Sequence, residues 1–143
     1  MIDTGDTGFM MICSALVLLM TPGLAFFYGG MVRRKNVVNT MMTSIFVIGI
    51  ATVMWVLFGY SLAFGVDHLG IIGDLSHLGL VGLTGKVGEY ASTIPDLGFA
   101  MFQMMFAIIT PALITGAVAG RMKFKALFLF IIFWSTLVYY PMA

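Results

Sequence analysis

Long apolar stretches constrain the fold of this chain more than any other feature. Four of them are as long as a membrane-spanning helix, at residues 8–30, 37–64, 97–119 and 124–143. An α-helix rises about 1.5 Å per residue and a bilayer core is about 30 Å thick, so about 20 apolar residues are enough to cross it. Only 9% of the residues are charged, and they lie between these stretches or at their ends. The pattern predicts an all-α integral membrane protein with four transmembrane helices.

The charged residues also predict an orientation in the membrane. Six of the seven Lys and Arg residues lie in two short loops, 31–36 and 120–125, and basic loops are typical of the cytoplasmic side. All six acidic residues lie in the N-terminal segment or in the loop 65–96. We therefore expect a multi-pass protein of the cell membrane. Its N-terminus and the loop 65–96 should lie outside, and the two basic loops should lie in the cytoplasm.

The sequence lacks the common signatures of catalysis and cofactor binding. It has no Gly-rich phosphate loop, no nucleophile elbow and no pair of carboxylates within a span. The single cysteine, Cys13, fits no metal-ligand cluster, and His68 and His77 stand nine residues apart in a loop without a neighbouring Cys. We expect no enzyme, no metal and no cofactor, and interpret both histidines as surface or loop-packing residues. The net charge of +1 does not support nucleic-acid binding.

The third stretch carries more than apolar filler. At 100° per residue, Phe99, Phe102, Gln103 and Phe106 fall on one face of a helix. Two interpretations remain open from this spacing: rings that face lipid or a neighbouring helix, and rings that line a path through the membrane. Gln103 favours the second, because an amide in lipid costs free energy unless it reaches a partner or water.

The inner half of the same stretch has features that affect packing. Ala112, Gly116 and Gly120 form a series of small residues at intervals of four, which lets a neighbouring helix approach closely. Pro111 removes a backbone donor, so we expect a kink at this point.

Four strings in the chain resemble one family of membrane proteins. They are PGLAFFYGGMVRRKN at 22–36, GYSLAFG at 59–65, FQMMFAIITPALITGAVAGRMKF at 102–124 and WSTLVYYPMA at 134–143. Together they resemble the N-terminal part of the ammonium transporter (Amt/Mep/Rh) family, in particular its bacterial and archaeal Amt branch. The resemblance runs in order through essentially all 143 residues.

The resemblance implies a larger fold than this chain can form. Family members have eleven membrane helices, arranged as an inverted repeat of two five-helix halves plus a last helix, and they assemble as trimers with one pore per subunit. Residues 1–143 would form a partial ammonium transporter domain with the first four helices. The twin histidines of the pore, the nearby aspartate and the second gate phenylalanine belong to later helices, so the resemblance implies a fragment.

The resemblance also implies roles for particular residues in moving ammonium or ammonia. Phe106 matches the phenylalanine that roofs the pore below an outer ammonium site, and Phe102 and Gln103 occupy the neighbouring outer turn. Four further residues resemble positions that line the inner part of the pore: Leu24, Phe27, Tyr28 and Leu113.

The resemblance leaves partners and rival functions to be tested. It implies a homotrimer and a PII-type regulatory protein that contacts the cytoplasmic face near Arg121, Lys123 and Lys125. One alternative is an ammonium sensor or a membrane scaffold that acts as an interaction module. Another is an unrelated four-helix transporter that works as an oligomer, although the spans hold no ionisable residue of the kind that most pumps use.

Overall fold

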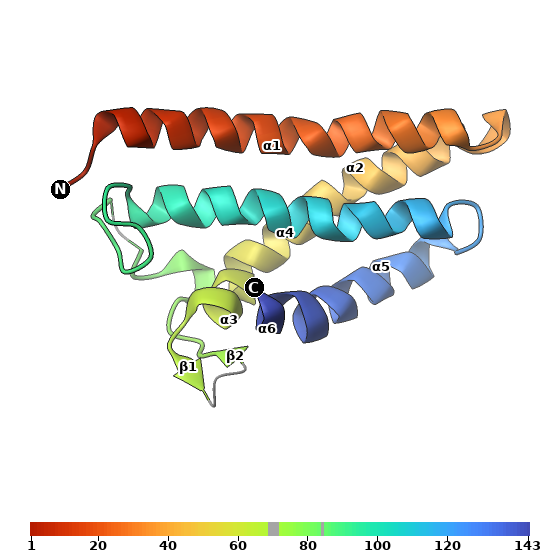
Figure 1. Ribbon diagram of the computed structural model, residues 1–143. Coiled ribbons are helices and arrows are strands. Elements are labelled where there is room, and N and C mark those ends of the chain that lie inside the picture. Colours follow the sequence, from red (N-terminus) through yellow and green to blue (C-terminus); the bar gives the residue numbers. More distant parts are fainter. Residues whose placement is uncertain (69–71, 84) are drawn as a thin grey trace.

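Helices dominate the computed structural model, which describes residues 1–68, 72–83 and 85–143. Four helical rods in this part of the chain are long and apolar enough to cross a membrane. They are Thr4–Met31, Arg34–Phe64, Asp96–Val118 and Phe124–Met142. The predicted all-α membrane fold with four long apolar helices is therefore confirmed (Figure 1).

The first rod is a single helix, α1 (Thr4–Met31), that continues through Pro22. Its N-cap is Asp3, whose carboxylate accepts hydrogen bonds from the backbone N–H groups of Gly5 at 2.7 Å and Asp6 at 3.1 Å. Such a cap satisfies donors that have no partner within the helix. The helix therefore starts four residues before the apolar stretch does.

The second and fourth rods each contain one wide, π-helical turn. The second comprises a 3-10 turn, α2, the π turn and α3, at Arg34–Asn36, Val37–Met54, Trp55–Gly59 and Tyr60–Phe64. The fourth comprises α5, a π turn and α6, at Phe124–Trp134, Ser135–Tyr139 and Tyr140–Met142. Each rod has the length of a spanning helix but changes its hydrogen-bond pattern near the end.

The ends of these two rods pack against each other around Tyr140. Its ring lies over Gly59, so closely that a Cβ at Gly59 would come within 2.7 Å of a ring carbon. Trp55 and Phe58 contact the same ring, with centroids 6.0 Å away in both cases. The ring is 2% exposed, so the absence of a side chain at Gly59 creates the space that Tyr140 fills.

The third rod is α4 (Asp96–Val118), which lies beside both α1 and α2. Pro111 is buried within it, and the α-helix continues on both sides of the proline. The helix ends before Gly120, whose φ of +71° places it in the left-handed region typical of a residue after a C-cap.

The core lies where α1, α2, α4 and α5 meet. Its buried members are Val47, Ala51, Met105, Ile108, Ala112, Leu127 and Ile131. Ser44 and Thr115 contribute a buried hydrogen bond of 3.0 Å between α2 and α4. Gly116, from the small-residue series of α4, lies against the ring of Tyr28. On α1, Gly29 lies against Met41, whereas a Cβ on Gly30 would meet none of the described residues within 4 Å.

A cap built from the loop after α3 covers one end of the bundle, next to the N-terminus (Figure 1). It contains the two-stranded antiparallel pair β1 (Asp67–His68) and β2 (Ile72–Gly73) and a 3-10 turn at Leu78–Leu80. The backbone N–H of Asp3 donates to the carbonyl of Thr93 at 2.9 Å and joins the N-terminus to this cap.

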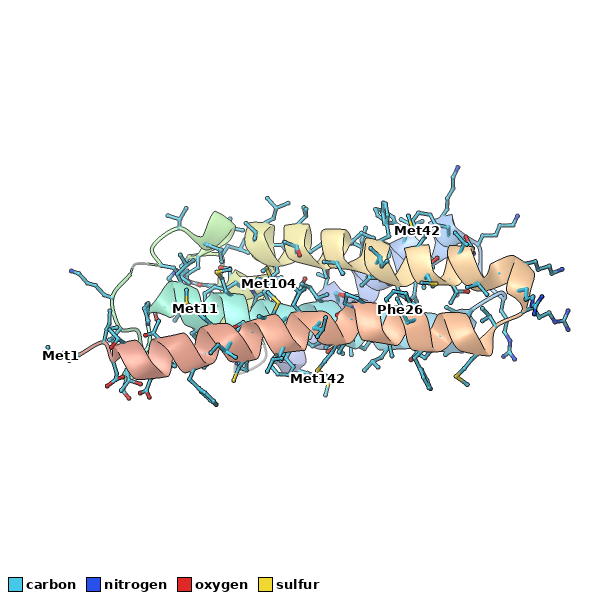
Figure 2. The ribbon with its side chains drawn as sticks, turned by 90° about the horizontal axis from the view of Figure 1, so that it is seen from above. Met1, Met11, Phe26, Met42, Met104 and Met142 are labelled. Atoms are coloured by element: carbon cyan, nitrogen blue, oxygen red, sulfur yellow. The ribbon has the colours of Figure 1, made fainter. Side chains whose placement is uncertain are left out.

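The two basic loops lie together at the opposite end. A Cβ on Gly120 would come within 3.2 Å of the Asn36 amide, so the loops are in contact. Figure 2 shows nitrogen-tipped side chains gathered chiefly at the end far from Met1. The structure thus separates acidic and basic residues between the two ends of the bundle.

Replacement of Gly59 by alanine tests the packing of the two π turns. The added Cβ overlaps the Tyr140 ring, and overpacking of a core typically costs about 1–3 kcal/mol. We expect Gly59→Ala to lower the melting temperature of the purified protein by several degrees. Gly49→Ala is the matched control, because a Cβ there meets nothing within 4 Å. Equal melting temperatures for both variants would show that this contact does not constrain the fold.

Candidate functional site

The candidate site residues of α4 form a stripe that α1 and α2 leave uncovered. Phe102, Thr110 and Leu113 lie within about 40° of Phe106 around the helix, at 100° per residue. Phe106 is 39% exposed and Leu113 is 50% exposed, whereas Ile108 on the opposite side is 1% exposed. The continuous helix across Pro111 keeps the outer and inner halves of the stripe in phase.

The outer part of this stripe consists of two rings and an amide. Phe102 and Phe106 make an edge-to-face contact, with ring centroids 5.2 Å apart and planes at 78°. This is a favourable arrangement for two aromatic rings. The half-buried amide of Gln103 stands beside them and has no hydrogen-bond partner anywhere in the described part of the chain. Its donors and acceptor are therefore available to another group.

Phe99 does not join this pair, although the helical spacing puts it on the same face. Its ring stacks on Tyr90, with centroids 5.7 Å apart and planes at 8°, and contacts Phe64 at 5.3 Å. Phe99 therefore shares the helical face of Phe102 and Phe106, but its ring contacts belong to α3 and the cap. The cap supplies other aromatic partners that the pattern of one helix does not include.

The inner part of the stripe is joined to α1 through Tyr28. The Tyr28 hydroxyl donates to the backbone carbonyl of Leu113 at 3.0 Å, and its ring lies against Gly116. The structure thus brings Tyr28 and Leu113 together across two helices. Phe27 contacts the Tyr28 ring with centroids 5.7 Å apart but is 61% exposed, whereas Leu24 is partly buried against the core.

A small cavity opens beside Tyr28 at the basic end of the bundle. Its volume is about 250 Å³, and its lining includes Tyr28, Met31, Gly116 and Arg121. The cavity lies between the ends of α1 and α4, so the inner residues of the stripe border open space.

The groups along this stripe can make cation–π, hydrogen-bond and apolar contacts with a ligand. The stripe offers ring faces, an amide, a hydroxyl and apolar side chains, and it holds no ionisable group. The described residues contain no group of three His, Cys, Asp or Glu side chains that could hold a metal ion. His77 packs within the cap: its Nδ1 lies 3.0 Å from the Val81 carbonyl, which accepts its proton, and its ring contacts Tyr60. The side chain of His68 lies outside the described residues.

Sequence reasoning missed Thr110, which stands between Phe106 and Leu113 on the stripe. Its hydroxyl donates to the Phe106 carbonyl at 2.7 Å, so it satisfies that backbone group a second time. The interval of four from Phe106 was the signal that could have identified it. No sequence signal predicts the contact of Trp55 with α4. Its buried indole N–H donates to the Ala100 carbonyl at 3.1 Å.

These features define a class of protein: a helical multi-pass membrane protein in which one helix carries a partly exposed pair of aromatic rings beside an amide without a described partner. Comparison with known proteins identifies the family. Residues 8–143 match the family model described as Ammonium Transporter Family. The chain therefore belongs to the ammonium transporter family, as its sequence motifs indicated.

Individual relatives agree with this assignment. The ammonium transporter of Bacillus subtilis (strain 168) is 54% identical over 139 residues, which cover 97% of this chain and 34% of that protein. A putative ammonium transporter of Methanothermobacter thermautotrophicus is 52% identical over 147 residues, which cover 100% of this chain and 35% of that protein. The crystal structure of Saccharomyces cerevisiae Mep2 superposes with a TM-score of 0.88 at 33% identity, over 99% of this chain and 34% of that one. The chain thus spans about a third of the length of its relatives.

Removal of the Tyr28 hydroxyl tests the link between α1 and the candidate stripe. Tyr28→Phe keeps the ring over Gly116 and removes only the hydrogen bond to the Leu113 carbonyl. One hydrogen bond contributes about 0.5–1.5 kcal/mol, so we expect the free energy of unfolding in detergent to fall by this amount. Unfolding of wild type and variant at the same denaturant concentration would contradict the link.

Proposed function

We propose that the complete protein transports ammonium or ammonia across the membrane, as a channel-like transporter, and that the stripe on α4 lines its path. One observation carries the proposal: Phe106, which is 39% exposed, contacts the partly buried ring of Phe102 beside an amide that has no partner in the described part of the chain. Membership of a family of ammonium transporters supports the choice of substrate. In this proposal the protein moves its substrate without chemical conversion.

The ring pair would act as a gate below an outer ammonium site. An ammonium ion near the face of Phe106 gains about 0.5–2 kcal/mol of cation–π attraction, and more as water is removed. Gln103 could replace a water molecule lost by the ion, because its amide oxygen accepts hydrogen bonds. A ring across a narrow passage obstructs free hydrated ions. Aromatic side chains are suited to both tasks.

The inner residues would favour a neutral molecule. Leu24, Phe27 and Leu113 carry no charge, and an unpaired ion in such surroundings costs several kcal/mol. The Tyr28 hydroxyl donates its hydrogen bond to the Leu113 carbonyl, so in this proposal it fixes the position of the inner pore wall. The inner stripe therefore suits ammonia better than the ammonium ion.

The assembly and setting form part of the same proposal. We place the complete protein in the cell membrane as a homotrimer, with the N-terminus and the cap outside. The basic loops 31–36 and 120–125 would then face the cytoplasm, where a PII-type regulatory protein could contact them. The asymmetric distribution of Lys and Arg supports this orientation.

Replacement of Phe106 tests the gate. We expect Phe106→Ala in the complete protein to raise the half-saturation concentration for labelled methylammonium by about 2- to 30-fold, which corresponds to a loss of about 0.5–2 kcal/mol. Uptake into cells that lack other ammonium transporters provides the measurement.

Phe130→Ala is the matched control for this experiment. Phe130 has the same exposure as Phe106, 39%, but belongs to α5 and lies away from the stripe. It should leave uptake unchanged. Equal uptake by wild type and Phe106→Ala would contradict the gate, and absence of saturable uptake by the wild type would contradict the transport function.

Labelling of single cysteines tests the orientation. In a background without native cysteines, Asp6→Cys should react with a membrane-impermeant maleimide in intact cells. Lys35→Cys should react only after the membrane is opened, because it stands in a basic loop at the other end of the bundle. The reverse pattern of labelling would show that the topology is inverted.

A further inference from the structure

A second cavity lies within the cap, away from the ring pair of α4. Its volume is about 380 Å³, in the range of small-ligand sites. The end of α3, the cap and the first turn of α4 line it. The lining residues are Tyr60, Phe64, Gly65, Val66, His77, Gly82, Leu83, Glu89, Tyr90 and Asp96.

Three aromatic rings form one wall of this cavity. Tyr60 and Phe64 stack with centroids 5.5 Å apart, and Tyr90 meets Phe64 edge-on at 5.3 Å. The buried indole of Trp55 supports the first two rings from behind, with centroids 5.9 and 6.1 Å away. Phe99 supports Tyr90 in the same way. The wall is therefore held in place by packing.

Two carboxylates complete the lining, and no Lys or Arg is among the described residues that border the cavity. The Asp96 carboxylate lies over Gly88, where a side chain would collide with it, and its backbone N–H donates to the Lys86 carbonyl at 3.0 Å. Within the described ranges, neither Glu89 nor Asp96 has a hydrogen bond or an ion pair to its side chain. Both charges are available to a ligand.

The position of Asp96 in the first turn of α4 accounts for only part of this arrangement. An acidic residue in the first turn interacts favourably with the positive end of the helix dipole. The dipole does not explain why Glu89, from another segment, borders the same space, or why three rings face it. Ring faces and carboxylates both attract cations.

The composition of the lining selects among cations. A calcium ion takes six to eight oxygen ligands, and two carboxylates beside aromatic walls do not provide that number. An ammonium or small alkylammonium ion gains from carboxylates through its N–H groups and from ring faces through its charge. We infer that the cap cavity binds an ammonium or small alkylammonium ion, at a site separate from Phe102, Gln103 and Phe106.

This inference rests on the proposed function and adds a step to it. The cavity and the ring pair share α4: Asp96 stands two turns before Gln103 on the same side of the helix. Phe99, which stacks on Tyr90, stands one turn before Gln103. A cation held in the cap would raise the local concentration of substrate above the gate.

The test measures binding and uptake of methylammonium by the complete protein in parallel. Binding is measured at low ionic strength in nanodiscs of zwitterionic lipid, so that lipid charge does not contribute. Glu89→Gln and Asp96→Asn should each weaken binding about threefold, and the double variant about tenfold, with smaller effects at high salt. Phe106→Ala should retain the cap site.

Asp6→Asn is the matched control. It removes an acid from the same end of the bundle that does not line the cavity, and it should leave binding unchanged. Equal binding by the double variant and wild type would overturn the inference. Displacement of methylammonium by sodium and calcium at matched ionic strength would also overturn the inference, because it would show that the cavity attracts any cation by charge alone. A wild type that binds methylammonium but shows no uptake would contradict the proposed function and leave the cap site standing.

Hydrogen exchange of the wild type tests the site without any substitution, so the result does not depend on whether the variants fold. Methylammonium should slow hydrogen exchange in the peptide that contains residues 85–96, relative to the same concentration of sodium. Identical exchange with the two ions would count against the site.

Discussion

Two side-chain donors hold α4 at its two ends, and the position of the candidate site depends on them. The Trp55 indole donates to the Ala100 carbonyl near the cap, and the Tyr28 hydroxyl donates to the Leu113 carbonyl near the basic loops. A bilayer core provides no water to replace such bonds. Because the donors come from the second rod and from α1, they fix the rotation of α4 about its own axis. The outer part of the stripe, around Phe106, is consequently left uncovered by α1 and α2.

The π turn in the second rod connects this anchoring to the cap. A π turn accommodates an extra residue, which moves the residues after it about 100° around the helix axis. Trp55 begins the turn and Tyr60 follows it, and both are buried, at 1% and 4% exposure. The next residue, Ser61, donates to the Asp74 carbonyl at 2.8 Å and accepts from the His77 backbone N–H at 3.0 Å. One local change in helix geometry thus places the indole on α4 and ties the rod to the cap.

Much of the fold could be predicted from the sequence, because each prediction depended on local composition. Apolar length predicted the four long helices, and the separation of acidic from basic residues placed the N-terminus beside the cap, as the hydrogen bond from Asp3 to Thr93 confirms. Contacts between distant segments were not predictable in this way. Phe99 has the helical phase of Phe106, yet it stacks on Tyr90, because a loop about ten residues earlier in the chain supplies a ring.

In the candidate site, too, the features set by local sequence were predictable and the contacts between distant helices were not. The motif and the helical spacing singled out Phe102, Gln103 and Phe106, and the structure places the two rings in contact. The bond from Tyr28 to α4 had no local signature, because a hydroxyl that donates to a carbonyl 85 residues away is set by the packing of two helices. The cap cavity was not predicted for a similar reason: Glu89 and Asp96 are seven residues apart in the sequence and border one cavity only in the folded chain.

The amide of Gln103 indicates whether the exposed stripe faces lipid or faces water and protein. Rings and aliphatic side chains are stable in lipid, so Phe106 and Leu113 alone would fit a lipid-facing surface as well as a pore wall. An amide without a partner costs about 1–3 kcal/mol when it is buried in apolar surroundings, and it has no such partner in the described part of the chain. Water or another protein segment removes this cost, and lipid does not. The relatives have about two thirds of their length beyond the portion that this chain matches. The side of α4 that carries Gln103 must therefore meet water or protein, as the proposed transport path requires.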